Sequence, residues 1–166
     1  SGDSYYAPLC MQYIGREVLS TELHVITPMD AANYWKFNPD DLVMVISFSG
    51  NTNRTVLAAK NAKSRGAKVI GITSDISSGL GSFCENVLLL PVFSKSRSIP
   101  HTVDYLVTLL SLVLIFESIA KVTFDIVDQL PLLIENAIQI SRPVCEKIGN
   151  QIASNDIFYF LGAGPN

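Results

Sequence analysis

The feature that most constrains the fold of this 166-residue chain is a short apolar run, Leu42–Ile46, that leads directly into a polar loop. The run reads Leu-Val-Met-Val-Ile, so both faces of a strand built from it would be apolar. Such strands are typical of parallel sheets that helices cover on both sides. Ligands bind beyond the carboxyl ends of the strands in these sheets. The run therefore predicts a fold class and also where a site should lie.

Helical and strand patterns alternate along the rest of the chain. The ranges with helical spacing are 5–20, 29–35, 51–65, 102–121, 129–140 and 143–153, and the further strand-like ranges are 23–26, 68–73, 87–90 and 157–161. Ser141 is expected to cap the last helix, which has Pro143 in its first turn. This alternation predicts an α/β fold with a doubly wound parallel β-sheet and helices on both faces, an α/β/α sandwich. Within it, Leu42–Ile46 should be a central strand flanked by 23–26 and 69–72.

The loop after the apolar run, residues 47–52, reads Ser-Phe-Ser-Gly-Asn-Thr and is followed by a predicted helix. The first N–H groups of that helix and its dipole favour an anion at this position. Gly50 permits a close approach of the backbone, while Ser47, Ser49 and Thr52 add neutral donors. The loop is therefore a candidate phosphate site.

A plainer interpretation is that Ser49 or Asn51 merely caps the helix. The three hydroxyls and the glycine within six residues favour the anion site over that interpretation. The loop is neither a Walker A sequence nor a GxGxxG fingerprint. The missing lysine favours a single phosphate on a small molecule over a nucleoside triphosphate.

Charge and composition exclude several classes of protein. A formal net charge of −3 with interspersed signs argues against nucleic-acid binding. The most apolar stretch, Tyr105–Phe116, is short for a membrane span and suits a buried helix, so no membrane association is expected. The cysteines Cys10, Cys84 and Cys145 are odd in number and widely spaced, which predicts three buried reduced thiols in a cytoplasmic protein. No metal and no cofactor are expected.

The segment 43–52, a following helix, and the run 66–73 (Gly-Ala-Lys-Val-Ile-Gly-Ile-Thr) together resemble the sugar isomerase (SIS) domain. This family includes the isomerase half of glucosamine-6-phosphate synthase, sugar-phosphate isomerases, glucosamine-6-phosphate deaminases and fructosamine-6-phosphate deglycases. The resemblance extends from the loop at 1–4 through the helix after Thr102. It implies a sugar phosphate as the ligand and a homodimer as the assembly.

The resemblance also implies particular site residues. The phosphate-binding residues are expected to be Ser4, Ser47, Ser49, Asn51 and Thr52. The sugar-contacting residues are expected to be Gly2, Phe48, Gly50, Ser98, His101 and Thr102. Phe48 replaces a glutamine that is usual in the synthase, and segment 94–97 (Ser-Lys-Ser-Arg) lacks the acidic residue found there. These departures argue against the aminotransferase type, and His101 is only a weak catalytic candidate.

The resemblance further implies a tandem arrangement of two units. Residues 1–153 would form a first SIS domain that lacks its first strand and includes the linker helices. Residues 154–166 would be the strand and loop that open a second SIS domain. The activity implied is that of an isomerase, deaminase or deglycase acting on a hexose 6-phosphate, with the catalytic base in the second copy. The alternative is a non-catalytic phosphosugar-sensing domain of a regulator.

Overall fold

The computed structural model describes residues 2–92, 102–154, 157 and 159. The chain divides into two compact units, residues 1–120 and residues 121–166. Each unit is described by itself below.

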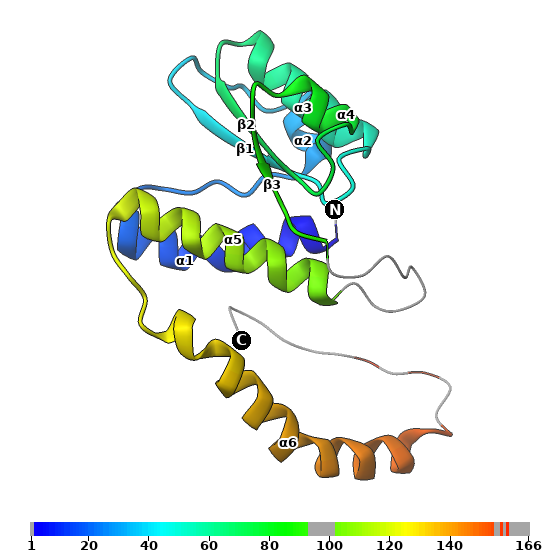
Figure 1. The fold of residues 1–166 in the computed structure, drawn as a ribbon. Coiled ribbons are helices and arrows are strands. Elements are labelled where there is room, and N and C mark those ends of the chain that lie inside the picture. The colour runs from blue at the N-terminus through cyan, green and yellow to red at the C-terminus, as the bar shows by residue number, and fades with distance from the viewer. Residues whose placement is uncertain (1, 93–101, 155–156, 158, 160–166) are drawn as a thin grey trace. The chain divides into compact units, whose positions relative to one another are not determined.

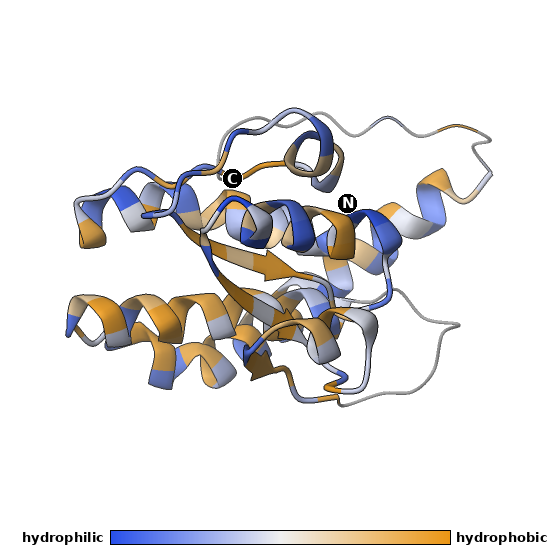
Figure 2. Ribbon diagram, turned by 90° about the horizontal axis from the view of Figure 1, so that it is seen from above, coloured by the Kyte–Doolittle hydropathy of each residue, from blue (hydrophilic) through white to orange (hydrophobic). Residues whose placement is uncertain are grey.

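The first unit contains a three-stranded parallel sheet in the order β1-β2-β3. The strands are β1 (Leu42–Ile46), β2 (Lys68–Thr73) and β3 (Asn86–Leu89). Val43 is the register partner of Val69, and Ile70 is the partner of Asn86. The strands are predominantly hydrophobic (Figure 2), as the apolar runs in the sequence predicted.

Helices cover both faces of this sheet (Figure 1). On one face lie α1 (Asp3–Leu19) and α5 (Thr102–Ala120), and on the other lie α2 (Pro28–Asn33), α3 (Asn53–Ser64) and α4 (Gly79–Phe83). The core on the α1–α5 side comprises Ala7, Met11, Ile72, Leu90, Leu112 and Phe116. On the opposite side, the buried residues are Ala31, Phe37, Val45, Ala58, Ala59, Ala62, Ala67, Leu80 and Cys84. The predicted α/β/α sandwich is confirmed.

Two predictions about the strands were wrong. In the described sheet β1 is an edge strand that pairs only with β2, not a central strand. Residues 23–26 belong to no strand or helix. Two of their apolar side chains nevertheless pack in the core. Leu23 packs against the core on the α1–α5 side, and Ile26 packs against the core on the α2–α3 side. The apolar character of both faces of Leu42–Ile46 therefore predicted the two helical layers correctly, but it did not predict the strand order.

The helix pattern also differs from the prediction in two places. The short helix α4 was not predicted, because its sequence, Gly-Leu-Gly-Ser-Phe, has little helical propensity. In the second unit, α6 (Ile126–Ile152) is one continuous helix that contains Pro131 and Pro143, so Ser141 caps nothing. A proline inside a helix removes a hydrogen bond, which is why the sequence predicted a boundary there. The apolar positions of α6 keep a helical period across both prolines, and none of its residues is buried.

Helix α5 is long and apolar enough to cross a membrane by length and composition alone. The run Tyr105–Phe116 alone is short for a membrane span, but α5 extends beyond this run at both ends. In the structure α5 packs along α1 and buries Thr108, Leu112 and Phe116. Its other side carries exposed leucines, among them Leu106 and Leu114. The expectation of a buried helix thus holds for one side of α5.

The three cysteines are free thiols in different environments. Cys84 is buried, and burial raises the pKa of its thiol. Cys10 is half-buried, and Cys145 is exposed. The expectation of three buried thiols holds for Cys84 alone. Cys10 Sγ lies 3.5 Å from the hydroxyl of Tyr105, and this hydrogen bond is the main reason that the pKa of Tyr105 rises to about 12.

Candidate functional site

The candidate phosphate loop, residues 47–52, follows β1 at the carboxyl edge of the sheet. Because β1 and β2 are parallel and Ile46 pairs with Ile72, the loop after β2 lies beside it. The backbone N–H of Ser47 donates to the carbonyl of Ile72 at 3.0 Å, which extends the pairing by one residue. The site therefore consists of two neighbouring strand-to-helix loops, the phosphate loop and the loop of residues 74–78.

The phosphate loop brings its hydroxyl groups close together. A tight turn closes it, in which the N–H of Gly50 donates to the carbonyl of Ser47 at 2.9 Å. Ser47 is only 4% exposed, and its hydroxyl lies 3.5 Å from the hydroxyl of Thr52. Ser49 and Thr52 are exposed. The turn thus gathers one buried and two accessible hydroxyls before the first turn of α3.

The amino end of α3 has no side-chain cap. Thr52 occupies the N-cap position, yet its side chain accepts no hydrogen bond from the first turn. The hydroxyl of Ser49 accepts a long hydrogen bond of 3.5 Å from the N–H of Asn51, within the loop. Capping residues normally satisfy one of the N–H groups that a helix leaves unpaired at its start. Here the hydroxyls and N–H groups at the start of α3 remain available to an acceptor such as a phosphate oxygen.

Gly50 is required by the neighbouring loop. Its φ is +65°, a conformation that other residues rarely adopt. A Cβ built on it would overlap the hydroxyl of Ser78 and lie 2.6 Å from Oγ1 of Thr73. Sequence reasoning assigned the close approach at this glycine to a ligand. The structure shows that the close approach is to the loop after β2.

Asn51 turns its side chain toward α4. Its Oδ1 accepts a hydrogen bond from the N–H of Gly79 at 2.9 Å, which ties the phosphate loop to the start of that helix. This leaves the Nδ2 group of Asn51 as the side-chain donor that it could offer an anion. Phe48 packs its ring against the core on the α1–α5 side, so only its backbone faces the neighbouring loop.

The other predicted site residues lie on different elements. Ser4 is half-buried in the first turn of α1, which begins beside the carboxyl ends of the strands (Figure 1). Gly2 precedes that turn with a φ of +66° and is exposed. Thr102 is the first residue of α5 and is exposed. Ser98 and His101 lie outside the described residues, as does segment 94–97.

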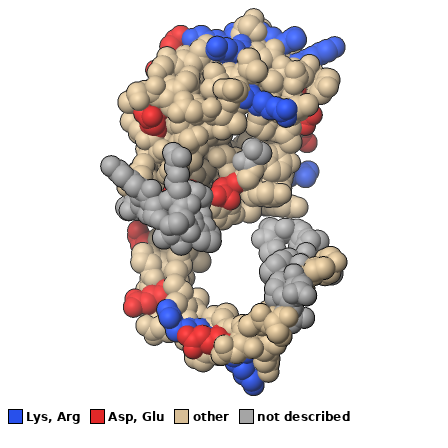
Figure 3. Space-filling model, turned by 90° about the vertical axis from the view of Figure 1, so that its right-hand side faces the viewer, with Lys and Arg blue, Asp and Glu red and all other residues tan. Residues whose placement is uncertain are grey.

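The described surroundings of the phosphate loop supply mainly neutral donors. Arg54 is the first basic residue after the loop, but its guanidinium contacts Sδ of Met29 at 2.9 Å. Lys and Arg side chains gather at one end of the first unit (Figure 3). Lys63 at the end of α3 and Lys68 at the start of β2 lie at the amino ends of the strands, opposite the loop. Binding of an anion would therefore rest on N–H and hydroxyl groups.

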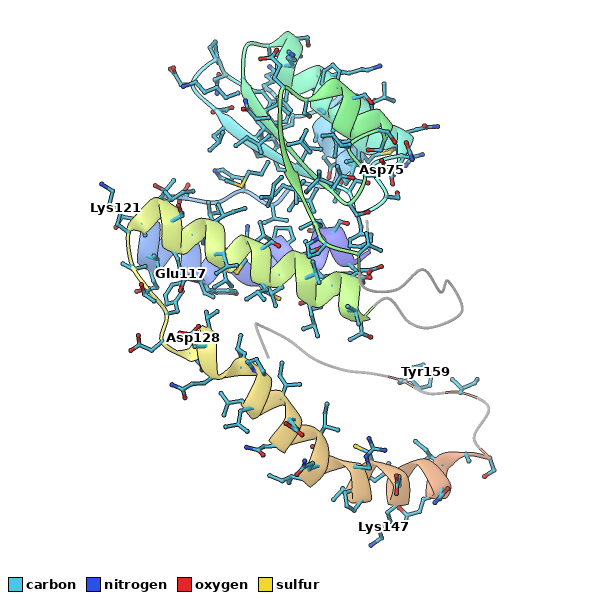
Figure 4. All side chains as sticks on the ribbon, in the orientation of Figure 1. Asp75, Glu117, Lys121, Asp128, Lys147 and Tyr159 are labelled. Carbon is cyan, nitrogen blue, oxygen red and sulfur yellow. The ribbon has the colours of Figure 1, made fainter. Side chains whose placement is uncertain are left out.

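The one acidic residue in the loop after β2 has its own local partners. Asp75 lies between β2 and α4 (Figure 4). The hydroxyl and the N–H of Ser77 donate to Oδ1 of Asp75 at 2.6 and 2.8 Å. These hydrogen bonds, with the hydroxyl first, hold the pKa of Asp75 below its ordinary value. Asp75 is thus an ionised, exposed group that organises its own turn.

Two surface depressions of the first unit do not involve the phosphate loop. One has a volume of 470 Å³ and is lined by residues of α1, α2 and the segment 24–27, including Gln12, His24 and Trp35. The other has a volume of 340 Å³ and lies at the amino ends of the strands, beside Lys63 and Glu85. Neither is lined by a residue of the loop.

Sequence reasoning missed the contribution of the loop after β2. Thr73, Ser74 and Ser78 all contact the phosphate loop or hold the turn that does. A signal was present, because these hydroxyls lie at the end of the strand next to β1 or just after it, and so they lie at the same edge of the sheet. The chain positions of the two loops, more than twenty residues apart, concealed it.

Comparisons with known proteins place this arrangement among its relatives. The family model described as SIS domain matches residues 34–118, which is more than half of the chain. A glutamine–fructose-6-phosphate aminotransferase (isomerizing) from Sulfolobus acidocaldarius is 26% identical over 166 residues, covering 99% of this chain and 27% of that protein. One from Clostridium acetobutylicum is 26% identical over 180 residues, covering 98% of this chain and 28% of that protein. The chain thus spans less than a third of the length of these relatives.

A solved structure is also similar. The glucosamine-6-phosphate deaminase from Thermotoga maritima has a TM-score of 0.78 and 26% sequence identity, covering 88% of this chain and 46% of that chain. The similarity therefore extends over nearly all of this chain and about half of the deaminase.

Proposed function

Because the chain belongs to the SIS domain family, we propose that it binds a sugar phosphate and holds the phosphate group at loop 47–52. The observation that carries the proposal is the amino end of α3, where Thr52 sits at the N-cap without capping the helix. Ser47, Ser49 and Thr52 would donate their hydroxyls to the phosphate oxygens, and the first N–H groups of α3 would add donors along the helix dipole. Ser4, at the start of α1, would contribute from the side.

The substrate class that we propose is a hexose 6-phosphate. Relatives and a similar structure carry names that refer to fructose 6-phosphate and glucosamine 6-phosphate. A phosphate held at one end of such a sugar would leave C1 and C2 at the other end for chemistry. We propose that Ser98, His101 and Thr102 contact the sugar there, with Gly2, Phe48 and Gly50 completing the contacts.

The reaction that we propose is aldose–ketose isomerisation, or the related deamination or deglycation. Each needs a base that moves a proton next to the carbonyl carbon. Loop 47–52 contains no carboxylate, and the carboxylate of Asp75 is held by Ser77. By resemblance to double-SIS enzymes, we propose that the base lies in a second SIS unit, with residues 1–153 as the first unit and 154–166 as the opening of the second. The full-length protein would act in the cytoplasm as a homodimer without a cofactor.

The direct test is calorimetry on the full-length protein. Fructose 6-phosphate, glucose 6-phosphate and glucosamine 6-phosphate should bind, and the corresponding parent sugars should bind poorly. If the parent sugars bind as tightly as their phosphates, the loop is not a phosphate site. Turnover of a hexose 6-phosphate would support the enzyme. Binding without turnover, together with a helix-turn-helix module elsewhere in the protein, would support the alternative of a phosphosugar sensor.

A further inference from the structure

One backbone carbonyl in the phosphate loop receives three hydrogen bonds from the neighbouring loop. The carbonyl of Phe48 accepts from Oγ1 of Thr73 at 3.1 Å, from Oγ of Ser74 at 2.7 Å and from the N–H of Ser74 at 2.8 Å. Thr73 is fully buried and Ser74 is half-buried. Since a carbonyl oxygen has two lone pairs, this acceptor is saturated. Both side chains therefore fix the position of a single peptide group.

Fixing this carbonyl also fixes an N–H group. In a trans peptide the C=O and the following N–H point in opposite directions, and the described residues include no cis peptide bond. With the carbonyl of Phe48 held toward the loop after β2, the N–H of Ser49 points away from that loop. Ser49 is an exposed residue of the proposed phosphate site, so its N–H is a candidate donor to the phosphate.

The next but one peptide group is held in the same way. The carbonyl of Gly50 accepts a hydrogen bond from the N–H of Leu80 at 2.9 Å. The N–H of Asn51 is thereby directed away from Leu80, and it makes a long hydrogen bond of 3.5 Å to Oγ of Ser49. Thr73, Ser74 and the start of α4 thus determine which way these two peptide groups of the phosphate loop point.

We propose that Thr73 and Ser74 are positioning residues for phosphate binding, which act by holding the Phe48–Ser49 peptide with its N–H toward the ligand. The inference rests on the proposed function of the phosphate loop. Neither side chain needs to touch the phosphate. Their role is to prevent the peptide from rotating and presenting its carbonyl, which would repel an anion.

The test compares two variants that each remove hydroxyl groups buried against backbone carbonyls. The first is the double substitution Thr73→Val with Ser74→Ala, which leaves the carbonyl of Phe48 one of its three donors. The matched control is Thr108→Val in α5, since Thr108 is 2% exposed and donates to the carbonyl of Asp104 at 2.8 Å. Thermal unfolding measures the stability of each full-length variant, and calorimetry measures the affinity for fructose 6-phosphate and for inorganic phosphate.

The double variant should bind both phosphates about tenfold more weakly, as expected from the loss of two neutral hydrogen bonds that hold the site. Thr108→Val should lower the melting temperature with unchanged affinity. Thr73→Ser keeps the hydroxyl, and together with wild-type Ser74 it should retain wild-type affinity. A crystal structure of the double variant should show the Phe48–Ser49 peptide rotated.

The outcomes separate this inference from the function on which it rests. If wild type binds the phosphates and the double variant binds them equally well, the positioning role is wrong while the phosphate site stands. The positioning role is also wrong if Thr108→Val weakens binding as much as the double variant, because the effect would then come from stability. If wild type binds neither fructose 6-phosphate nor inorganic phosphate, the proposed function fails and this inference fails with it.

Discussion

Two strand-to-helix loops lie side by side at the carboxyl edge of the sheet, and they use similar residues in opposite ways. Residues 47–52 and 74–78 both contain several hydroxyl side chains and lead into a helix. In the second loop the hydroxyls are engaged with the protein itself, and Ser78 caps α4 by accepting from the N–H of Gly81 at 3.1 Å. In the first loop Thr52 stands at the same N-cap position of α3 and caps nothing.

The difference teaches that a loop rich in serine and threonine is not a binding site by composition alone. What distinguishes the two loops is whether the helix start is satisfied by its own side chains. The second loop is internally satisfied and acts as a support. The first is satisfied only in part and has donors left for a ligand. The predictions below change residues of these two loops, from the largest expected effect to the smallest.

The largest effect should come from removing the accessible hydroxyls of the first loop. Replacing Ser49 and Thr52 together by Ala should weaken binding of fructose 6-phosphate by about 3–6 kcal/mol if the two losses add, since each hydrogen bond to a charged oxygen contributes roughly 1.5–3 kcal/mol. Calorimetry measures the change. The matched control is Ser77→Ala in the second loop, which should bind as wild type does. If both variants lose the same affinity for fructose 6-phosphate, the two loops do not differ in their role in binding.

Adding one methyl group at Gly50 should lower the stability of the protein more than adding one at Gly79. Gly50→Ala introduces a Cβ that meets Ser78 and Thr73 at a positive φ, so unfolding free energy should fall by about 2–4 kcal/mol from strain and overpacking. Gly79→Ala is the control, because its Cβ would meet Val56 Cγ2 at 3.5 Å, an ordinary contact. Chemical denaturation gives both values. A Gly50→Ala protein as stable as wild type would show that the two loops are not in close contact.

The two N-cap residues should respond differently to truncation. Ser78→Ala removes the cap of α4 and should lower the unfolding free energy by about 1 kcal/mol. Thr52→Ala removes no cap and should change the stability of the unliganded protein by less, while weakening phosphate binding. Thermal unfolding with and without fructose 6-phosphate measures both properties. If Thr52→Ala destabilises the unliganded protein as much as Ser78→Ala does, Thr52 is an ordinary cap.

The smallest expected effect is on the stability of the fold at low pH. Hydrogen bonds from Ser77 hold the pKa of Asp75 below its ordinary value of 3.8. A depressed carboxyl pKa stabilises the fold above the pKa of the unfolded chain, and this contribution is lost as the pH falls through the folded value. Asp75→Asn should therefore lose a small stabilisation at neutral pH and match wild type at low pH. If the pKa of Asp75 measured by NMR titration is higher in Ser77→Ala than in wild type, the hydrogen bonds from Ser77 are the cause of the lowered pKa. An unchanged pKa would refute this cause.

The sequence predicted the part of the site that is continuous along the chain. The apolar run Leu42–Ile46, the loop and α3 were all found, because strand, loop and helix follow one another. The strand order was not, since Leu42–Ile46 looks the same at an edge as in the centre once helices cover both faces. Contacts of the second loop with Gly50 could not be read either, because they depend on which strand lies next to β1.

The hydrogen bond between Asn51 and Gly79 has a thermodynamic consequence for the supporting loop. If holding the phosphate loop improves the affinity for a phosphate, the bound phosphate must strengthen that hold by the same factor, because linkage between binding and conformation is reciprocal. Ligand should then slow amide hydrogen exchange in α4, although that helix contributes no donor to the phosphate. The ordering produced by binding would in this way extend beyond the residues that touch the ligand.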